Sequence, residues 1–279
     1  MTMRSIASRV VGRSYPLTKR VAQLRMRGAG PPVVVFSMGK TGSTAIARAV
    51  QDATGRRVFQ VFRLDAERLA QAEARYRANA APPFPGALHL WESEHLLRRP
   101  PSPAAPWTVI TTVREPVAQA VSAFFHGSPR RNLLQDVPSV DELAKVLLDE
   151  GWVRTALRWF DREFAPALGI DVYAEPFDPE RGSAELDRPS ARVLLLRQEN
   201  RAEAPEALGR FLGRPGPVEV AARNEAASKE YAARYREFLR CVRLPAAVLD
   251  QAYRSRYARH FYADEELEQF RRRWTEGSL

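Results

Sequence analysis

The stretch Val33-Val34-Val35-Phe36-Ser37-Met38-Gly39-Lys40-Thr41-Gly42-Ser43-Thr44 decides how the rest of the chain is interpreted. Its first four residues are apolar, three of them β-branched, and they predict a short buried strand. A loop with two glycines and a lysine follows, and residues 45–50 predict a helix with Ser43 or Thr44 as its N-cap. Outward-pointing N–H groups and the helix dipole make such a unit an anion site, to which Lys40 adds a full positive charge.

The order of residues in this loop is not that of a nucleotide-hydrolase P-loop, in which four residues separate the first glycine from a Gly-Lys-Ser/Thr ending. In Gly39-Lys40-Thr41-Gly42-Ser43-Thr44 the lysine directly follows the first glycine. The loop resembles the phosphosulfate-binding loop of sulfotransferases, Pro-Lys-Ser-Gly-Thr-Thr, with Gly39 in place of the proline. An ordinary strand-to-helix turn that carries Gly, Ser and Lys is the alternative interpretation.

The composition is that of a globular protein with an anionic ligand or partner. The 279 residues are 45% hydrophobic and 27% charged, with a net charge of +10. This charge favours a nucleotide, nucleic acid, acidic glycan or anionic lipid surface, and solubility alone is the alternative reason for it. The single cysteine, Cys241, excludes an intramolecular disulfide and a cysteine-rich metal site. No apolar run of about 18 residues predicts a membrane-spanning helix, so we expect a cytoplasmic protein.

Residues 1–32 form a basic N-terminal arm, with seven Lys or Arg residues, no acid and scattered apolar residues. Two interpretations stay open. The arm either lies as an amphipathic segment on a membrane or an acidic partner, or packs on the domain as an extension. No sharp compositional break follows, and residues 33–279 are therefore predicted to form a single α/β domain.

Strands alternate with helices in the first half of the chain, which predicts a central parallel sheet with right-handed crossovers. We expect strands at 33–36, 57–62, 87–91 and 107–113, and helices at 45–50, 65–79, 93–99 and 117–125. The second half is more helical. We expect helices at 140–149, 152–164 and 203–212, an extended piece at 169–173, a strand at 191–197 and a helical stripe of Tyr231, Tyr235, Phe238 and Val242. Ligands of such sheets bind at the carboxyl ends of the strands, where Lys40, Arg114 and the residues after Leu90 would lie.

A second motif follows the clearest predicted strand. Arg114 ends this strand, and Ser122 comes eight residues later on the next predicted helix. Arginine offers a bidentate fork to a phosphate group, and a serine hydroxyl adds a donor. The segments Thr111-Thr112-Val113-Arg114-Glu115-Pro116 and Val121-Ser122-Ala123-Phe124-Phe125 resemble the sulfotransferase motif that holds the 3′-phosphate of 3′-phosphoadenosine 5′-phosphosulfate (PAPS). A structural salt bridge is the alternative role of Arg114.

Later segments resemble a bacterial family described as capsular polysaccharide synthesis proteins. They are 159–161, 169–173 and 224–238, the last with Asn224, Lys229 and Tyr231. Glu230 and Ala232 replace the tryptophan and serine of that family's usual pattern, so this part of the match is partial. Over residues 33–275 the resemblance to P-loop sulfotransferases implies a three-layer α/β sandwich with a central, mostly parallel sheet and a helical second half.

The resemblance also implies an activity and roles for individual residues. It implies a sulfotransferase that moves a sulfonate group from PAPS to a hydroxyl or amine of a glycan, glycolipid or other small acceptor, without a metal. Lys40 would stabilise the leaving oxygen. Donor binding would fall to Gly39, Lys40, Thr41, Gly42, Ser43, Thr44, Arg114, Ser122 and Lys229, with Arg223 beside the last. A solvated helix face is the alternative role of Arg223 and Lys229.

Three residues are candidates for the base that takes the acceptor's proton. His89 lies within the expected strand at 87–91, Glu92 lies at its exit, and His95 comes shortly after them. Histidine titrates near neutral pH without tuning, whereas a glutamate would need burial to raise its pKa. Strand alternation could equally bury His89 as an ordinary core residue.

Two other functions remain alternatives. A P-loop kinase of a small molecule would need a different loop order and an acidic strand end for magnesium. A non-catalytic basic module would bind an anionic polymer or a membrane. Nucleic acid is not expected as a partner, because no basic strand with interleaved aromatic residues and no recognition-helix pattern occurs.

Overall fold

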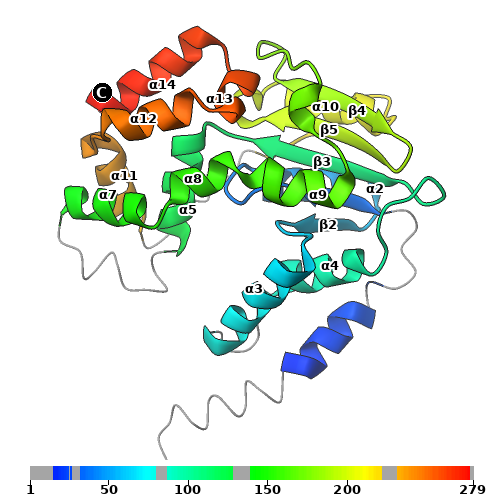
Figure 1. Cartoon of the computed structure of the whole chain (residues 1–279). Helices are drawn as coiled ribbons and strands as arrows, with labels where there is room; N and C mark the ends of the chain where they lie inside the picture. Colours follow the sequence, from blue (N-terminus) through cyan, green and yellow to red (C-terminus); the bar gives the residue numbers. More distant parts are fainter. Residues whose placement is uncertain are drawn as a thin grey trace, which may run out of the picture.

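A five-stranded sheet forms the centre of the protein (Figure 1). The computed structural model describes residues 15–24, 26, 32–79, 87–127, 139–221 and 231–276. The strand order is β2-β1-β3-β5-β4, with β4 antiparallel to β5 and the other neighbours parallel. The strands are β1 (Val33–Phe36), β2 (Val58–Val61), β3 (Trp107–Val113), β4 (Ser183–Arg188) and β5 (Ala191–Arg197). The predicted α/β class with a mostly parallel sheet is confirmed.

Helices cover both faces of the sheet, and the alternation of β1 explains why both are apolar. Val33 and Val35 pack in one cluster with α2 and α10, whereas Val34 and Phe36 belong to the larger cluster on the other face. The helices are α2 (Ser43–Thr54), α3 (Ala66–Asn79), α4 (Leu88–Leu97), α5 (Pro116–Gly127), α7 (Val140–Asp149), α8 (Trp152–Leu157), α9 (Ala165–Leu168), α10 (Ala204–Phe211), α11 (Ala232–Cys241), α12 (Ala246–Tyr253), α13 (Arg256–Phe261) and α14 (Asp264–Glu276), with single turns η2 (Phe160–Phe164), η3 (Val172–Ala174) and η4 (Gln198–Asn200). This arrangement is the expected three-layer sandwich.

Several predicted elements agree with the structure. The strands at 107–113 and 191–197 and the helix at 140–149 have the predicted bounds. Asp65 caps α3 as expected, since its carboxylate accepts a hydrogen bond from the Arg68 N–H at 2.8 Å. The side chains of the predicted stripe Tyr231, Tyr235, Phe238 and Val242 all belong to or pack against the core.

The expected strand at 87–91 is wrong, because this segment begins the helix α4. Short apolar runs do not distinguish a buried strand from a buried helix, and here α4 buries Leu90, Trp91 and Leu96 beside the edge strand β2. The strand β4 escaped prediction because it is a polar edge strand with mostly unburied side chains.

Two smaller expectations also fail. The helix expected at 152–164 is interrupted, since α8 gives way to the π-helical turn η2. The expected extended piece at 169–173 contains the start of the 3₁₀ turn η3. Both regions lie in an aromatic cluster, whose packing overrides the local pattern of each segment.

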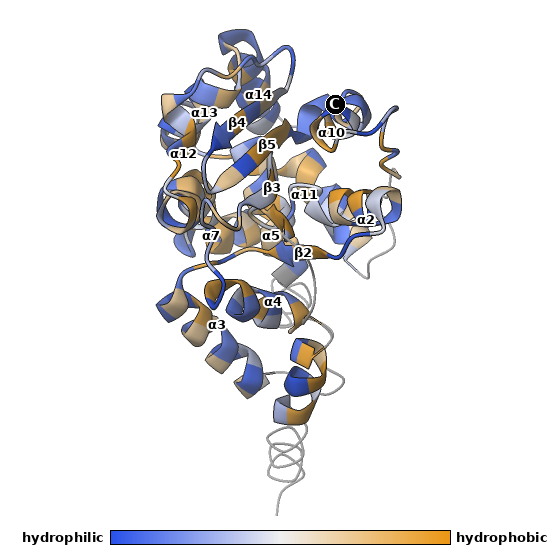
Figure 2. Cartoon of the chain, turned by 90° about the vertical axis from the view of Figure 1, so that its right-hand side faces the viewer, coloured by the Kyte–Doolittle hydropathy of each residue, from blue (hydrophilic) through white to orange (hydrophobic). Residues whose placement is uncertain are grey.

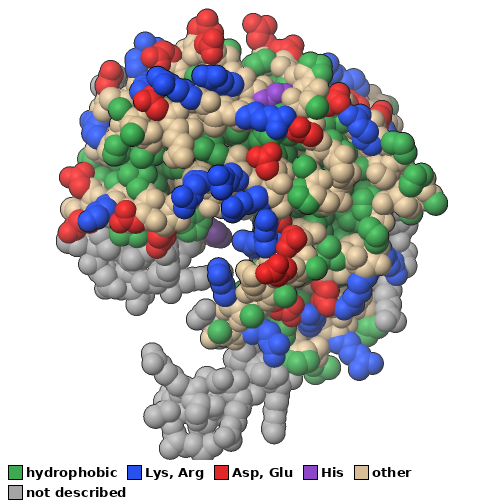
Figure 3. Space-filling view, viewed as in Figure 1, with side chains coloured by type: hydrophobic (Ala, Val, Ile, Leu, Met, Phe, Trp, Pro, Cys, Tyr) green, Lys and Arg blue, Asp and Glu red, His purple; other side chains and the backbone are tan. Residues whose placement is uncertain are grey.

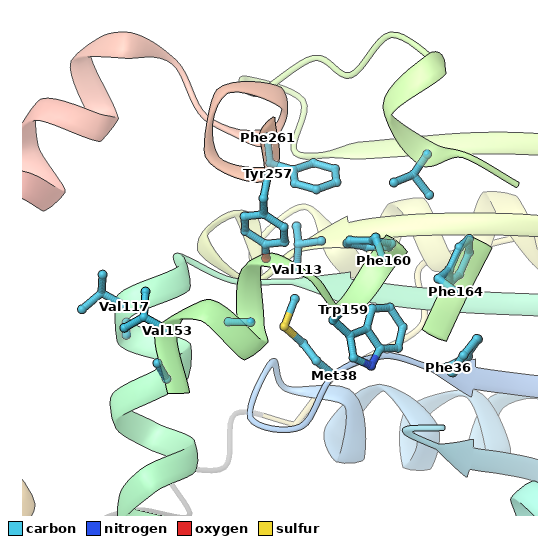
Figure 4. Close-up of a cluster of buried hydrophobic side chains, with 14 of the residues drawn as sticks. Phe36, Met38, Val113, Val117, Val153, Trp159, Phe160, Phe164, Tyr257 and Phe261 are labelled. Carbon is cyan, nitrogen blue, oxygen red and sulfur yellow. The ribbon is translucent and has the colours of Figure 1, made fainter. Parts of the chain in front are cut away.

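The aromatic cluster contains Phe36, Trp159, Phe160 and Phe164, and it holds the segment 159–164 over the end of β1 (Figure 4). The ring of Trp159 lies 5.0 Å from that of Phe36, and Phe164 stacks on Phe36 at 5.6 Å. Trp159 Nε1 also donates to the Phe62 carbonyl at 3.1 Å, just after β2. Met38 lies among these side chains and Val113 in the close-up. The loop after β1 therefore starts from a rigid base.

Glu115 joins the C-terminal helices to the end of β3. Its buried carboxylate accepts hydrogen bonds from the Val117 and Ala118 N–H groups at 2.7 Å, which caps α5. It also accepts from the Tyr253 hydroxyl at 2.9 Å and from Trp274 Nε1 at 3.3 Å. Desolvation raises the pKa of the Glu115 carboxyl, and the hydrogen bonds from Val117, Ala118 and Tyr253 offset only part of this rise. One carboxylate thus satisfies donors from α5, α12 and α14.

Replacing Glu115 by alanine should destabilise the protein strongly, because two backbone N–H groups, a tyrosine hydroxyl and an indole N–H would lose their buried acceptor. We expect the free energy of unfolding to fall by about 3–5 kcal/mol in urea denaturation. The exposed Glu219→Ala variant is the control and should change it by less than about 0.5 kcal/mol. Equal stability of the two variants would contradict this role of Glu115.

Candidate active site

The loop after β1 and the residue after β3 meet at the carboxyl edge of the sheet. β1 and β3 are neighbouring parallel strands, so their ends lie side by side. Arg114 Nη1 donates to the Lys40 carbonyl at 3.0 Å. The structure therefore brings together the two segments that sequence motifs had singled out separately, across 74 positions in the chain.

The backbone of the loop has a turn conformation suited to a candidate anion site. Lys40 has φ 70° and Gly42 has φ 83°, so left-handed residues flank Thr41. The Gly39 carbonyl accepts from Gln119 Nε2 at 2.7 Å, as the Lys40 carbonyl does from Arg114. Because C=O and N–H point in opposite directions across a trans peptide, the N–H groups of Lys40 and Thr41 face away from these two side chains. Successive N–H groups in such a turn bind anions.

The hydroxyl groups of the loop have different partners. Thr41 is fully buried, donates to the Met38 carbonyl at 2.8 Å, and has its Oγ1 2.6 Å from that of Thr112. Its hydroxyl therefore holds the loop to β3, which leaves the backbone N–H as the group of Thr41 that a bound anion could contact. The hydroxyls of Ser43 and Thr44 accept from Gln60 Nε2 at 3.1 and 3.0 Å and keep their own protons to donate.

The helix α2 starts from Gly42 instead of the expected Ser43 or Thr44 cap. The left-handed backbone favours a glycine there, and any Cβ would force the end of the Gln198 side chain to move. The φ of Gly42 lies in the left-handed region, and a Cβ at this position would lie 2.1 Å from Gln198 Oε1. Gln198 follows β5, so the ends of three neighbouring parallel strands converge on the loop.

Arg114 is held by a tyrosine from the C-terminal helices. The Tyr257 hydroxyl donates to the Arg114 carbonyl at 2.8 Å and lies 3.2 Å from the Arg114 N–H. Ser122 is buried on α5, two turns beyond Arg114. Lys229 and Arg223, which the sequence suggested for the donor's 3′-phosphate, lie outside the described residues.

The three candidate bases lie along α4, which runs antiparallel to β2. The ring of His89 lies 5.1 Å from that of Phe62, which follows β2. Glu92 Oε2 accepts from the Gln60 N–H at 2.9 Å, and His95 stacks on Phe59 at 5.5 Å. His89 therefore lies beside the residue that follows the carboxyl end of β2, Glu92 lies beside Gln60, and His95 lies beside Phe59.

Glu92 has a structural task on the open edge of the sheet. It supplies an acceptor to a β2 N–H that no further strand pairs within the described residues, and it lies 3.4 Å from Arg57. Desolvation raises the pKa of the Glu92 carboxyl to about 7, although the Gln60 N–H and Arg57 lower it. Burial and nearby arginines lower the pKa of His95.

Exposed arginines lie along α8 and η2, and α8 itself packs against α5, α12 and α13. Arg154, Arg158 and Arg162, here called the basic strip, follow one another at four-residue spacing along α8 and η2. Lys and Arg side chains gather where α8 crosses the face seen in Figure 3 and border a hollow there. Arg68 Nη1 donates to the Arg162 carbonyl at 2.8 Å, which ties the strip to α3.

Gln119 and Gln60 hold the loop, and the sequence reasoning missed both. Gln119 stands alone among the apolar residues of α5, and Gln60 interrupts the apolar strand β2. A single amide within a buried apolar run is a signal of a polar partner, and this signal could have indicated both residues.

Neither a metal cluster nor a membrane-spanning helix occurs in the part of the chain that the structure describes. No three or more His, Cys, Asp or Glu side chains there are grouped so that they could hold a metal ion. None of the helices there is both long and apolar enough to cross a membrane.

Comparison with known proteins gives one match. Residues 136–263 match the model of a family described as putative capsular polysaccharide synthesis protein. The match supports the resemblance to that family and suggests a glycan-related function. It includes the basic strip and Tyr257 but not the loop, Arg114 or Ser122. No curated protein and no solved structure matches the chain significantly.

Glu92 should make stability depend on pH. Its folded pKa of about 7 exceeds the ordinary 4.5, so the folded protein retains a proton that the unfolded chain loses. The contribution of Glu92 to the free energy of unfolding is therefore largest below about pH 4.5. It falls by about 3 kcal/mol as the pH rises to about 7. Glu92→Gln removes this ionisation. The urea midpoint of the variant, measured relative to that of the wild type, should therefore rise between pH 5 and 8. A constant difference between the two proteins would contradict this.

Proposed function

We propose that the protein is a sulfotransferase that moves a sulfonate group from PAPS to a hydroxyl group of a glycan. The observation that carries this proposal is the contact between Arg114 and the Lys40 carbonyl. It joins a lysine-bearing anion loop to an arginine on the neighbouring strand end. PAPS carries anionic groups at two separate positions, and two adjacent anion sites match that requirement.

The residues of the loop would stabilise the charge that develops during transfer. In sulfonate transfer, an acceptor oxygen attacks sulfur while the bond from sulfur to the bridging oxygen of the donor breaks. Negative charge then grows on that bridging oxygen. Lys40 and the N–H groups of the loop are preorganised donors for it, because Gln119 and Arg114 hold the carbonyls on the other side of the same peptides.

His89 is the base that the geometry favours. It lies at the carboxyl end of β2, next to the strand that carries the loop, and it is half-buried. In this proposal His89 takes the proton of the acceptor hydroxyl as the oxygen attacks sulfur. Glu92 is engaged by the Gln60 N–H and Arg57, and it acts as a support of the β2 edge.

The basic strip and the family match both favour a glycan with acidic groups as acceptor. Arg154, Arg158 and Arg162 are exposed, and among described residues none of them forms an ion pair with a carboxylate. Guanidinium groups recognise sugar carboxylates by paired hydrogen bonds. The strip also lies within the stretch that matches the capsular polysaccharide family.

Binding of 3′,5′-bisphosphoadenosine, the product that PAPS leaves behind, is the first test. Calorimetry should show binding to the wild type, and Arg114→Ala should weaken it by about 10–100-fold, because a charge-assisted contact is lost. Arg210→Ala, an exposed arginine on α10, is the control and should bind normally. Absence of binding to the wild type would refute the proposal. Magnesium-dependent turnover of ATP that Lys40→Ala abolishes would favour a kinase instead.

Turnover of sulfur-labelled PAPS with acidic glycans tests the base. His89→Gln should lower kcat by about a hundredfold or more while bisphosphoadenosine still binds, because glutamine cannot accept the proton. His95→Gln is a matched change on the same helix and should retain most of the activity. The assignment of His89 would be wrong if Glu92→Gln, with stability checked, lost activity while His89→Gln kept it.

A further inference from the structure

Residues 15–24 form a further helix, before β1 in the chain, and this helix exposes an apolar face. Among the described residues, the exposed large apolar side chains are Leu17, Val21, Leu24 and Leu88. Three of these four lie on this one helix, with exposed fractions of 66%, 43% and 50%. Their spacing of four and three residues places them on the same side of a helix. Exposed apolar residues that cluster in this way mark an interaction surface.

The opposite face of the same helix is anchored on the domain. Tyr15 is buried, and its hydroxyl accepts a hydrogen bond from Trp91 Nε1 on α4 at 2.9 Å. Lys19 Nζ lies 2.7 Å from carboxylates of Glu73 on α3 and Glu94 on α4. Gln23 Nε2 donates to Glu94 at 2.9 Å. The helix is therefore docked in a fixed orientation, and its apolar side is left facing outward.

The figures show where this helix lies. It is the dark blue helix of Figure 1, beyond α4 and away from the C-terminal helices. Figure 2 shows orange, hydrophobic residues on it, at the end of the molecule opposite α12–α14. The described part of the basic arm thus packs on the domain, as one interpretation of the sequence expected, and still presents an apolar surface.

Charge decides which partner fits this surface. Residues 1–32 hold seven Lys or Arg residues and no acid. Arg20 is exposed next to Val21, whereas Lys19 is the residue that neutralises the acids underneath. A stripe of three side chains is also small beside the roughly 1,000 Å² that a stable protein interface buries. A short apolar stripe flanked by cations suits the headgroup region of an anionic bilayer.

We propose that the helix over residues 15–24 docks the protein on an anionic lipid surface, with Leu17, Val21 and Leu24 in the headgroup boundary. Arg20 and the other basic residues of the arm add electrostatic attraction to the lipid phosphates. The inference does not depend on the proposed sulfotransferase activity. Docking through this helix would bring the proposed active site to membrane-bound acceptors.

Vesicle co-sedimentation of the full chain tests the proposal. Vesicles of phosphatidylglycerol and phosphatidylcholine should bind the wild type, and phosphatidylcholine vesicles should bind it much more weakly. Raising the salt from 0.1 to 0.5 M should weaken binding, because surface charges are screened. Leu17→Gln/Val21→Gln/Leu24→Gln should lose at least about tenfold in partition, since the apolar burial is gone.

Leu88→Gln is the control, because it removes the exposed leucine of another helix, and it should bind vesicles like the wild type. Equal binding of wild type and triple variant would overturn the proposal, as would no binding of the wild type. Sedimentation equilibrium without lipid checks the alternative occupant. If the wild type is a dimer and the triple variant is a monomer, the apolar face binds a second copy of the chain, and the lipid assignment is overturned. Bisphosphoadenosine binding by the same proteins reports separately on the proposed function.

Discussion

The architecture of the site depends on the hydrogen bonds that the buried carboxylate of Glu115 accepts. This carboxylate caps the first turn of α5 and at the same time accepts from Tyr253 and Trp274 in the C-terminal helices. A buried carboxylate is stabilised only when its oxygens are fully hydrogen-bonded, so these groups must come together. Arg114 precedes this residue and Gln119 follows it on α5. The cap formed by Glu115 therefore sets where Arg114 and Gln119 contact the loop after β1.

The loop after β1 gains its shape from side chains that lie elsewhere in the chain. Gln119 and Arg114 hold two consecutive carbonyls, Thr112 holds the Thr41 hydroxyl, and Gln198 packs on Gly42. A non-glycine residue with left-handed φ, such as Lys40, costs about 1–3 kcal/mol and persists where its surroundings fix it. An anion that binds here meets donors that are already oriented, which reduces the reorganisation needed on binding.

Sequence patterns predicted the parts of the fold in which local and tertiary preferences agree. β3 and β5 are continuous apolar runs, as buried parallel strands are, and their bounds were predicted. The pattern failed at 87–91, where a short apolar run forms α4, and at β4, whose polar side chains face solvent on the sheet edge. The loop and the Arg114–Ser122 spacing were visible in the sequence. The contacts of Gln119, Gln60 and Tyr257 with them were not, since they join residues up to 143 positions apart.

By itself the sequence determined that a strand, a glycine-bearing loop and a helix follow one another at 33–50, because backbone propensity and apolar periodicity are local properties. It also determined which residue types stand at the strand ends. Only the tertiary structure decided where each candidate base lies along β2. The antiparallel course of α4 along β2 places His89 at the carboxyl edge and assigns Glu92 to the unpaired Gln60 N–H. The reason is physical: the open edge of a sheet needs an acceptor, and which residue supplies it depends on packing across the fold.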